Sequence, residues 1–269
     1  MAANPTRNLA LFCDFENIAL GVRDARFDAF DIQKVLERLL LKGNIVVRKA
    51  YCDWGRYQTF KPAMHEAAFE LIDIPHVRQS GKNSADIRMV VDALDLCYTK
   101  SHVDTFVVIS GDSDFSPLVS KLRENNKTVI GVGVKNSTSD LLMSNCDEFI
   151  FYDDLIRQTR KKDEGRAKKA SRKKTKKTAA PSVDEKTQEA FDLVLETTEA
   201  LFSDRDAEEK VWGSMVKQAL KRRKPGFSES YHGFKSFNHL LQEAEKNGLL
   251  DLQHDEKSGG YIIKSYRGE

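Results

Sequence analysis

The sequence lacks the features that mark zinc-binding, disulfide-bonded, secreted and membrane-spanning proteins. It holds four cysteines in 269 residues, with no CxxC pair and no short Cys/His spacing. Neither a zinc site nor a disulfide framework is therefore predicted. No apolar run approaches the ~18–20 residues that span a bilayer, and the first residues lack the apolar stretch of a secretory signal. We expect a soluble cytoplasmic protein with no membrane association.

An excess of positive over negative charge is found in only one segment. The net charge is only +2, yet residues 158–180 contain 11 basic and 2 acidic residues and no large apolar side chain. Such a segment cannot form a core. We therefore predict a folded domain in residues 1–157, a basic flexible linker in residues 158–184 and a second folded domain in residues 185–269.

The linker carries lysine pairs, among them Lys168 with Lys169 and Lys173 with Lys174. One interpretation is a solvated spacer. The other is an arm that contacts the phosphates of a nucleic acid, since the release of condensed counterions gives affinity without regard to sequence.

Strands and helices are predicted to alternate through the first domain. Apolar β-branched runs indicate strands at residues 9–15, 44–51, 74–77, 104–109, 128–134 and 148–151. Helical spacing indicates helices at residues 32–41, 58–72, 85–99, 115–125 and 139–145, and the first strand is expected to run into a loop through Glu16 and Asn17. This rhythm is typical of an α/β fold, a Rossmann-like parallel sheet with helices on both faces.

Acidic residues occupy the predicted strand ends and one helix start. Asp14 closes the first strand, Asp112 and Asp114 follow the fourth, and Asp86 opens a helix. The first and fourth strands should be neighbours at the switch point of a doubly wound sheet, where ligands bind at the carboxyl ends. Converging carboxylates repel one another unless a cation binds between them, and oxygen ligands favour Mg²⁺ or Mn²⁺.

Such an ion would favour phosphodiester hydrolysis, because it can polarise a phosphoryl oxygen and orient a hydroxide. Asn17 offers a neutral oxygen or amide to the same site, and Lys82 and Arg88, which flank Asp86, are expected to meet substrate phosphates. Some of these acids could instead have purely structural roles. Asp86 could serve only as a helix cap, and the segment from Asp112 to Asp114 could be a turn-and-cap motif for the following helix.

The C-terminal part is predicted to form helices followed by a hairpin. Apolar residues from Phe191 to Leu201 follow a helical period, and further helical stretches are expected at residues 208–221, 228–232 and 234–247. A hairpin is expected from residues 249–253 and 261–263. The last three of these helical stretches, followed by a hairpin wing, indicate a winged helix-turn-helix.

Three motifs of the first domain resemble those of the NYN domain family. They are Asp14-Phe15-Glu16-Asn17-Ile18, Lys82-Asn83-Ser84-Ala85-Asp86 and Ser110-Gly111-Asp112-Ser113-Asp114-Phe115. The family belongs to the PIN-like nuclease superfamily and includes the LabA-like proteins of bacteria. The resemblance implies a PIN-like three-layer α/β/α fold and a ribonuclease that depends on Mg²⁺ or Mn²⁺. Asp14, Asp86 and Asp112 would be the metal-binding acids, with Asp114 completing the acidic set and Asn17 supporting it.

The C-terminal domain resembles the OST-HTH domain, also called LOTUS. The similar segments are residues 211–220, residues 227–250 and Gly260-Tyr261-Ile262-Ile263, which fits the wing. The resemblance implies contacts with RNA or with a protein partner.

Two other functions compete with a ribonuclease. A phosphatase of the haloacid-dehalogenase type would need a second aspartate two residues after Asp14, where this chain has Glu16. A non-catalytic RNA-binding regulator with the same fold is the stronger alternative, because the linker and C-terminal domain would serve it equally well.

Overall fold

The computed structural model describes residues 7–75, 84–159, 185–204, 210–256 and 258–267. The chain divides into two compact units, one of Met1–Leu39 with Gly43–Thr175 and one of Leu40–Lys42 with Lys176–Glu269. The linker residues Lys168, Lys169, Lys173 and Lys174, and also Lys82, lie outside the described residues.

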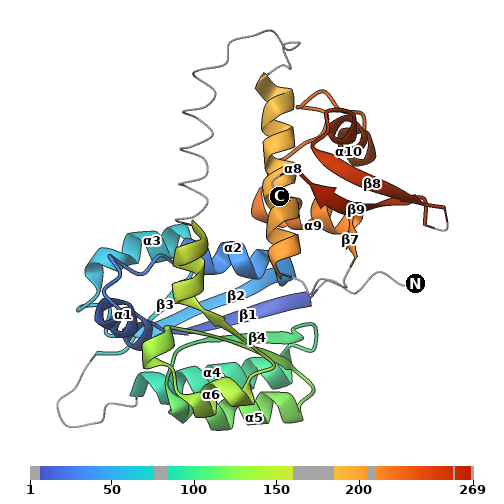
Figure 1. Cartoon of the computed structure of the whole chain (residues 1–269). Helices are drawn as coiled ribbons and strands as arrows, with labels where there is room; N and C mark the ends of the chain where they lie inside the picture. The colour runs from blue at the N-terminus through green and yellow to red at the C-terminus, as the bar shows by residue number, and fades with distance from the viewer. Residues whose placement is uncertain (1–6, 76–83, 160–184, 205–209, 257, 268–269) are drawn as a thin grey trace. The chain divides into compact units, whose positions relative to one another are not determined.

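A parallel sheet of six strands forms the centre of the first unit (Figure 1). Its spatial order is β3-β2-β1-β4-β5-β6. The strands are β1 (Arg7–Asp14), β2 (Gly43–Cys52), β3 (Glu70–Asp73), β4 (Thr105–Ile109), β5 (Thr128–Gly133) and β6 (Glu148–Phe151). The α/β class is thus confirmed, and β1 lies beside β4 as predicted.

Helices cover both faces of this sheet. Figure 1 shows α1 (Phe15–Asp24), α2 (Ile32–Lys42) and α3 (Lys61–Glu66) on one side, and α4 (Ser84–Thr99), α5 (Ser116–Glu124) and α6 (Asp140–Asn145) on the other. The short 3₁₀ helices are η1 (Gln58–Phe60), η2 (Ser113–Phe115) and η3 (Lys135–Ser137), and residues 152–159 are also helical. Among the described residues, none of these helices has the length and apolar character needed to cross a membrane.

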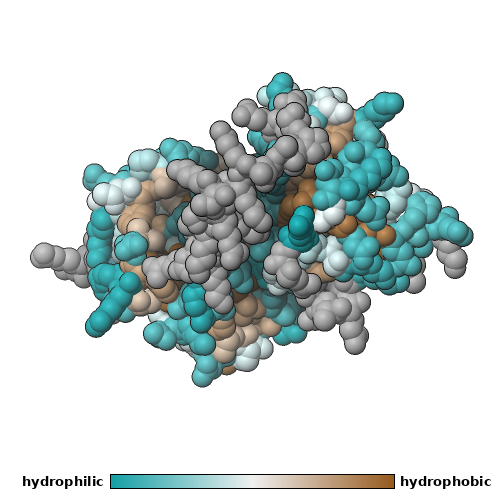
Figure 2. Space-filling model, turned by 45° about the horizontal axis from the view of Figure 1, so that its top comes forward, coloured by the Kyte–Doolittle hydropathy of each residue, from teal (hydrophilic) through white to brown (hydrophobic). Residues whose placement is uncertain are grey.

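Alternation along β1 builds two cores. Leu9, Leu11 and Cys13 belong to the cluster on one face of the sheet. Ala10 and Phe12 belong to the cluster on the other face, since successive side chains of a strand point in opposite directions. Strand β1 is therefore packed on both of its faces. At the surface, the coloured residues in Figure 2 are mostly hydrophilic, and hydrophobic ones show in limited areas.

Three predictions for the first unit are wrong. The loop expected through Glu16 and Asn17 is the first turn of α1, because the Asp14 side chain accepts a hydrogen bond from the Asn17 N–H and so begins the helix directly after the strand. The helix expected at residues 58–72 ends at Glu66. The strand expected at residues 74–77 is found instead as β3 at residues 70–73; residues 74 and 75 belong to no strand, and residues 76 and 77 lie outside the described residues. Ala68 has a φ of 57°, which turns the chain toward the sheet.

The second unit combines helices with a small antiparallel sheet. It contains α8 (Glu185–Asp204), α9 (Gly213–Arg223), α10 (Phe237–Lys246), β7 (Val211–Trp212), β8 (Leu250–Asp255) and β9 (Gly260–Tyr266), and the strand order is β7-β9-β8. The predicted hairpin is confirmed as β8 and β9. Val211 and Trp212 lie within the helix expected at residues 208–221. They form a strand instead, because they pair with β9. Residues 228–232 form turns and no helix.

Candidate functional site

The carboxyl ends of β1 and β4 bring Asp14 and Ser110 together. Cys13 pairs with Ile109 across the two strands, so the residues that follow each of them are neighbours. The Ser110 hydroxyl donates to Asp14 Oδ2 at 3.0 Å, and Asp14 Oδ1 accepts from the Asn17 N–H at 3.2 Å. Asp14 is only 7% exposed. Its carboxylate is therefore buried and held in one orientation.

The turn after β4 is tied to the start of α1. The Gly111 N–H donates to Asn17 Oδ1 at 2.8 Å, and the Asp112 N–H donates to the Ser110 hydroxyl at 3.2 Å. A Cβ atom on Gly111 would lie 2.3 Å from the Ser137 carbonyl oxygen, so a side chain cannot be added without a shift of backbone. This turn fixes where Asp112 stands relative to Asp14.

Asp112 is half-buried and Asp114 is exposed. Asp112 Oδ1 accepts from the Asp114 N–H at 3.0 Å and so caps η2. The cap role anticipated for this segment is real, but it requires only one of the two carboxylate oxygens of Asp112. A structural role and a ligand role are therefore compatible in the same side chain.

Electrostatic effects show that the four acids lie near one another. Burial is the largest of the effects that raise the pKa of Asp14 to about 7, and the charges of Asp86 and Asp112 add to it. The hydrogen bonds from Asn17 and Ser110 act in the opposite direction. Burial, followed by the charges of Asp112, Asp114 and Glu16, raises the pKa of Asp86 to about 6. The structure thus brings together the acids that the sequence selected from β1, α4 and the turn after β4.

The chemistry of these acids fits a divalent cation. They present oxygen donors, and the strongest charges acting on Asp86 are all carboxylates. A bound cation would offset this repulsion, and Mg²⁺ and Mn²⁺ favour such ligands. Within the residues that the structure describes, no three His, Cys, Asp or Glu side chains stand already arranged as a metal-binding group.

Glu16 and Arg56 were not selected from the sequence. Arg56 Nη1 donates to Glu16 Oε1 at 2.8 Å, and the Arg56 guanidinium lies 6.0 Å from the centre of the Tyr57 ring. Recognising Asp14 as a helix cap could have indicated Glu16, because Glu16 then lies in the first turn of the helix, beside the capping residue. Arg56 follows β2, which neighbours β1, so the carboxyl-end rule for parallel sheets could have indicated it.

Arg88 is not brought to the acids. It lies two residues after Asp86, which places it about 200° around the helix, and its Nε donates to Asp92 Oδ1 at 3.0 Å. Asp92 also accepts from the Tyr51 hydroxyl at 2.9 Å and from Lys49 at 3.2 Å. This network lowers the pKa of Asp92 despite the opposing effect of burial. It joins α4 to the sheet.

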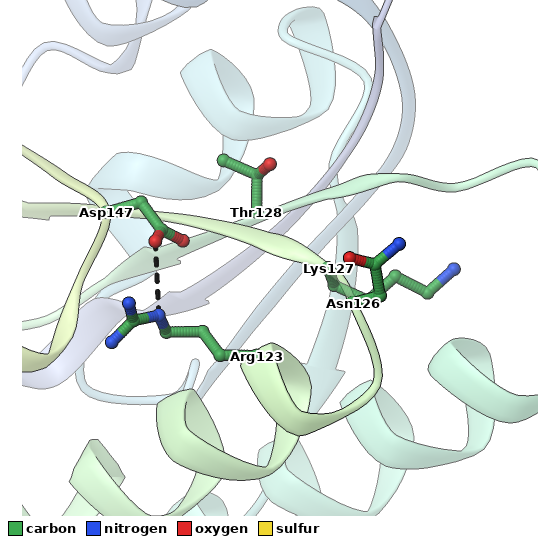
Figure 3. A pocket seen from close by; sticks show the side chains of 5 residues that line it. All are labelled: Arg123, Asn126, Lys127, Thr128 and Asp147. Carbon is green, nitrogen blue, oxygen red and sulfur yellow. Dashed lines mark ion pairs between the residues drawn. The ribbon is translucent and has the colours of Figure 1, made fainter.

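A hollow at the opposite edge of the sheet has a different character (Figure 3). It is lined by Arg123, Asn126, Lys127, Thr128 and Asp147. Arg123 and Asp147 form an ion pair at 3.1 Å, and Asp147 also accepts from the Val129 N–H. Because Thr128 begins β5, this hollow lies at the amino ends of the strands, away from the acids. Its charged groups serve to hold the neighbouring loops.

Comparisons with known proteins match the first unit. The family model described as NYN domain matches residues 8–153, which include all six strands of the parallel sheet except Arg7. An uncharacterized protein from Methanocaldococcus jannaschii is 28% identical over 138 residues, which are 51% of this chain and 54% of that protein. The chain therefore spans about half the length of this curated relative.

A solved structure is also similar. The crystal structure of a protein of unknown function from Vibrio parahaemolyticus is 26% identical, with a TM-score of 0.51. The similarity covers 58% of this chain and 98% of that one.

Proposed function

This chain belongs to the NYN domain family of the PIN-like nuclease superfamily, and on that premise we propose that it is a divalent-metal-dependent endoribonuclease that hydrolyses phosphodiester bonds of RNA. One observation carries the proposal. Burial, together with the charges of neighbouring carboxylates from α4 and from the turn after β4, raises the pKa of Asp14 and of Asp86 at a single edge of the sheet. Such crowding costs folding free energy, and perturbed carboxylates of this kind cluster at functional sites.

We assign the metal ligands to Asp14, Asp86 and Asp112. A bound Mg²⁺ or Mn²⁺ would polarise the scissile phosphate and lower the pKa of an attacking water. Ser110 holds the Asp14 carboxylate in place, and Asn17 holds the turn that carries Asp112. Asp114 stands exposed at the rim, where it adds to the negative charge that attracts the ion.

RNA contacts are assigned to residues outside the acidic cluster. Lys82 precedes α4, and the linker pairs Lys168-Lys169 and Lys173-Lys174 supply concentrated positive charge. Counterion release would give these lysines affinity for RNA of any sequence. Arg88 is a weaker candidate, because Asp92 already pairs with it. Cytoplasmic location is part of the same proposal.

The second unit is proposed to be a winged helix-turn-helix of the OST-HTH type. Three helices and a three-stranded antiparallel sheet support this assignment. The exposed side chains of α10 are Asn238, Gln242, Glu245 and Lys246, and Lys246 is paired with Glu243. A largely uncharged helix face whose one exposed lysine is paired suits a protein partner or the bases of RNA better than phosphates.

A non-catalytic RNA-binding role is the second candidate. One observation favours it: Asp14 and Asp112 both cap helices, so each has a structural use that needs no catalysis. Binding without hydrolysis would then be the whole activity of the first unit.

Removal of the ion separates these candidates. We expect the native chain to cut labelled single-stranded or structured RNA in Mg²⁺ or Mn²⁺, to stop in excess chelator and to recover when Mn²⁺ is restored. Gel analysis of the products measures the loss and recovery. Cleavage that continues in chelator would exclude the metal-dependent mechanism, and binding without cleavage in every ion would favour the second candidate.

A further inference from the structure

Helix α4 exposes three large hydrophobic side chains. Ile87 is 63% exposed, Val91 56% and Tyr98 64%, and they are half of the six large hydrophobic residues that are exposed in the described part of the chain. Single exposed hydrophobic residues are ordinary. Three on one helix are unusual, because each leaves apolar surface in water at a cost of roughly 25 cal/mol per Å².

These side chains form one stripe. At about 100° per residue, Tyr98 and Val91 lie roughly 20° and 40° around the helix from Ile87. The stripe runs for about 17 Å at 1.5 Å per residue. The buried residues Met89 and Ala93 lie on the opposite side, where α4 packs on the sheet. The stripe therefore faces away from the core of its own unit.

Opposite charges stand on one flank of the stripe. Arg88 and Asp95 lie about 100° and 80° around the helix from Ile87, so both are on the same side. Both are exposed. Their midpoint falls between residues 91 and 92, within about one residue of the midpoint between Ile87 and Tyr98. The charge pattern and the hydrophobic pattern thus share one centre.

We propose that the stripe is the contact surface of a homodimer in which two α4 helices pack antiparallel about a twofold axis. Rotation about an axis through the shared centre places Ile87 against the partner's Tyr98. The same rotation keeps the charged flank on the same side of the pair, so Arg88 meets the partner's Asp95, and Asp95 meets the partner's Arg88.

This self-complementarity favours a second copy of the chain over other occupants. A twofold interface must present one patch to itself, and a patch with opposite charges at equal distances from its centre meets that requirement. One helix from each copy buries less than the ~800 Å² per partner of a standard interface. The dimer should therefore be weak and depend on protein concentration. The inference rests on α4 alone and does not depend on RNA hydrolysis.

Sedimentation equilibrium of the full chain tests the hydrophobic contact. The native chain should form dimers as its concentration rises, and Val91→Asp should raise the dimer dissociation constant by at least about tenfold. Circular dichroism should show the variant folded. A native chain that stays monomeric throughout overturns the proposal. The proposal is also overturned if Val91→Asp lowers the stability of the monomer, because residues of the same chain would then cover the stripe.

A charge exchange tests the geometry. Arg88→Glu and Asp95→Arg should each weaken the dimer by roughly threefold or more, and the double variant should return to within about twofold of native affinity. Arg88→Glu also removes the pair with Asp92 within the chain. That loss is the same in the single and double variants, so their difference reports the contact between copies. A double variant as weak as the singles would contradict the antiparallel arrangement.

Discussion

Asp112→Asn should lower the single-turnover rate constant for RNA cleavage by about 10²–10³-fold or more, a size typical for the loss of one group that stabilises transition-state charge. Asparagine keeps an oxygen that can accept from the Asp114 N–H, so the cap on η2 survives. The substitution removes the negative charge through which Asp112 acts on Asp14 and Asp86. Cleavage at saturating RNA should fall while RNA affinity and the thermal midpoint stay near native.

Asp24→Asn is the matched control. Asp24 ends α1, the helix that Asp14 caps, and its exposed side chain pairs with Arg23 on the surface, where ion pairs contribute little. Cleavage by this variant should stay within about twofold of native, since no transition-state contact is lost. If the native chain cuts RNA and Asp112→Asn cuts it equally fast, the assignment of Asp112 is wrong.

Without a divalent ion, the chain should lose stability as the pH rises through neutrality. The pKa of Asp14 is about 7 in the folded chain, against an ordinary value of 3.8 for an aspartate. The folded chain therefore binds this proton more tightly than the unfolded chain does. The resulting stability is fully present below about pH 4 and is lost as the pH rises through about 7. A difference of this size corresponds to about 4 kcal/mol.

Urea unfolding in chelator, followed from about pH 5 to about pH 8, measures this loss. Asp86, whose pKa is about 6, should add a smaller effect of the same sign, because it is only half-buried. Asp14→Asn should remove most of the slope. Saturating Mn²⁺ should also flatten it, since the ion replaces the protons. A native curve with no slope over this range would show that the acids do not crowd one another.

The arrangement of the sheet could be predicted because it follows from chain-wide patterns. Alternating strands and helices require a parallel sheet, and its switch point places Asp14 beside the turn that carries Asp112. The start of α1 could not be predicted in the same way. A single hydrogen bond from the Asn17 N–H to Asp14 begins that helix, and the sequence pattern does not show whether such a cap forms.

Pairings between particular side chains far apart in the chain could not be predicted from the sequence. The pair of Arg56 with Glu16 joins residues 40 positions apart, and no periodicity in the sequence relates them. The strand at Val211 and Trp212 was missed for a similar reason, because only pairing with Ile262 and Ile263 makes these two residues a strand. Local pattern favoured a helix there, and the long-range pairing overrode it.

Calorimetric titration of Mn²⁺ into the native chain, in two buffers of different ionisation enthalpy, tests the carboxylate ion site most directly. At about pH 6, where Asp14 and Asp86 retain protons, binding should be saturable and should release protons; the release should decline toward zero above about pH 8. Asp86→Asn should weaken binding by at least about tenfold, because losing a ligand should cost at least as much as losing a group that only orients one. If Mn²⁺ does not bind saturably, or if Asp86→Asn binds it as tightly as the native chain does, the claim of an ion site at these carboxylates is contradicted.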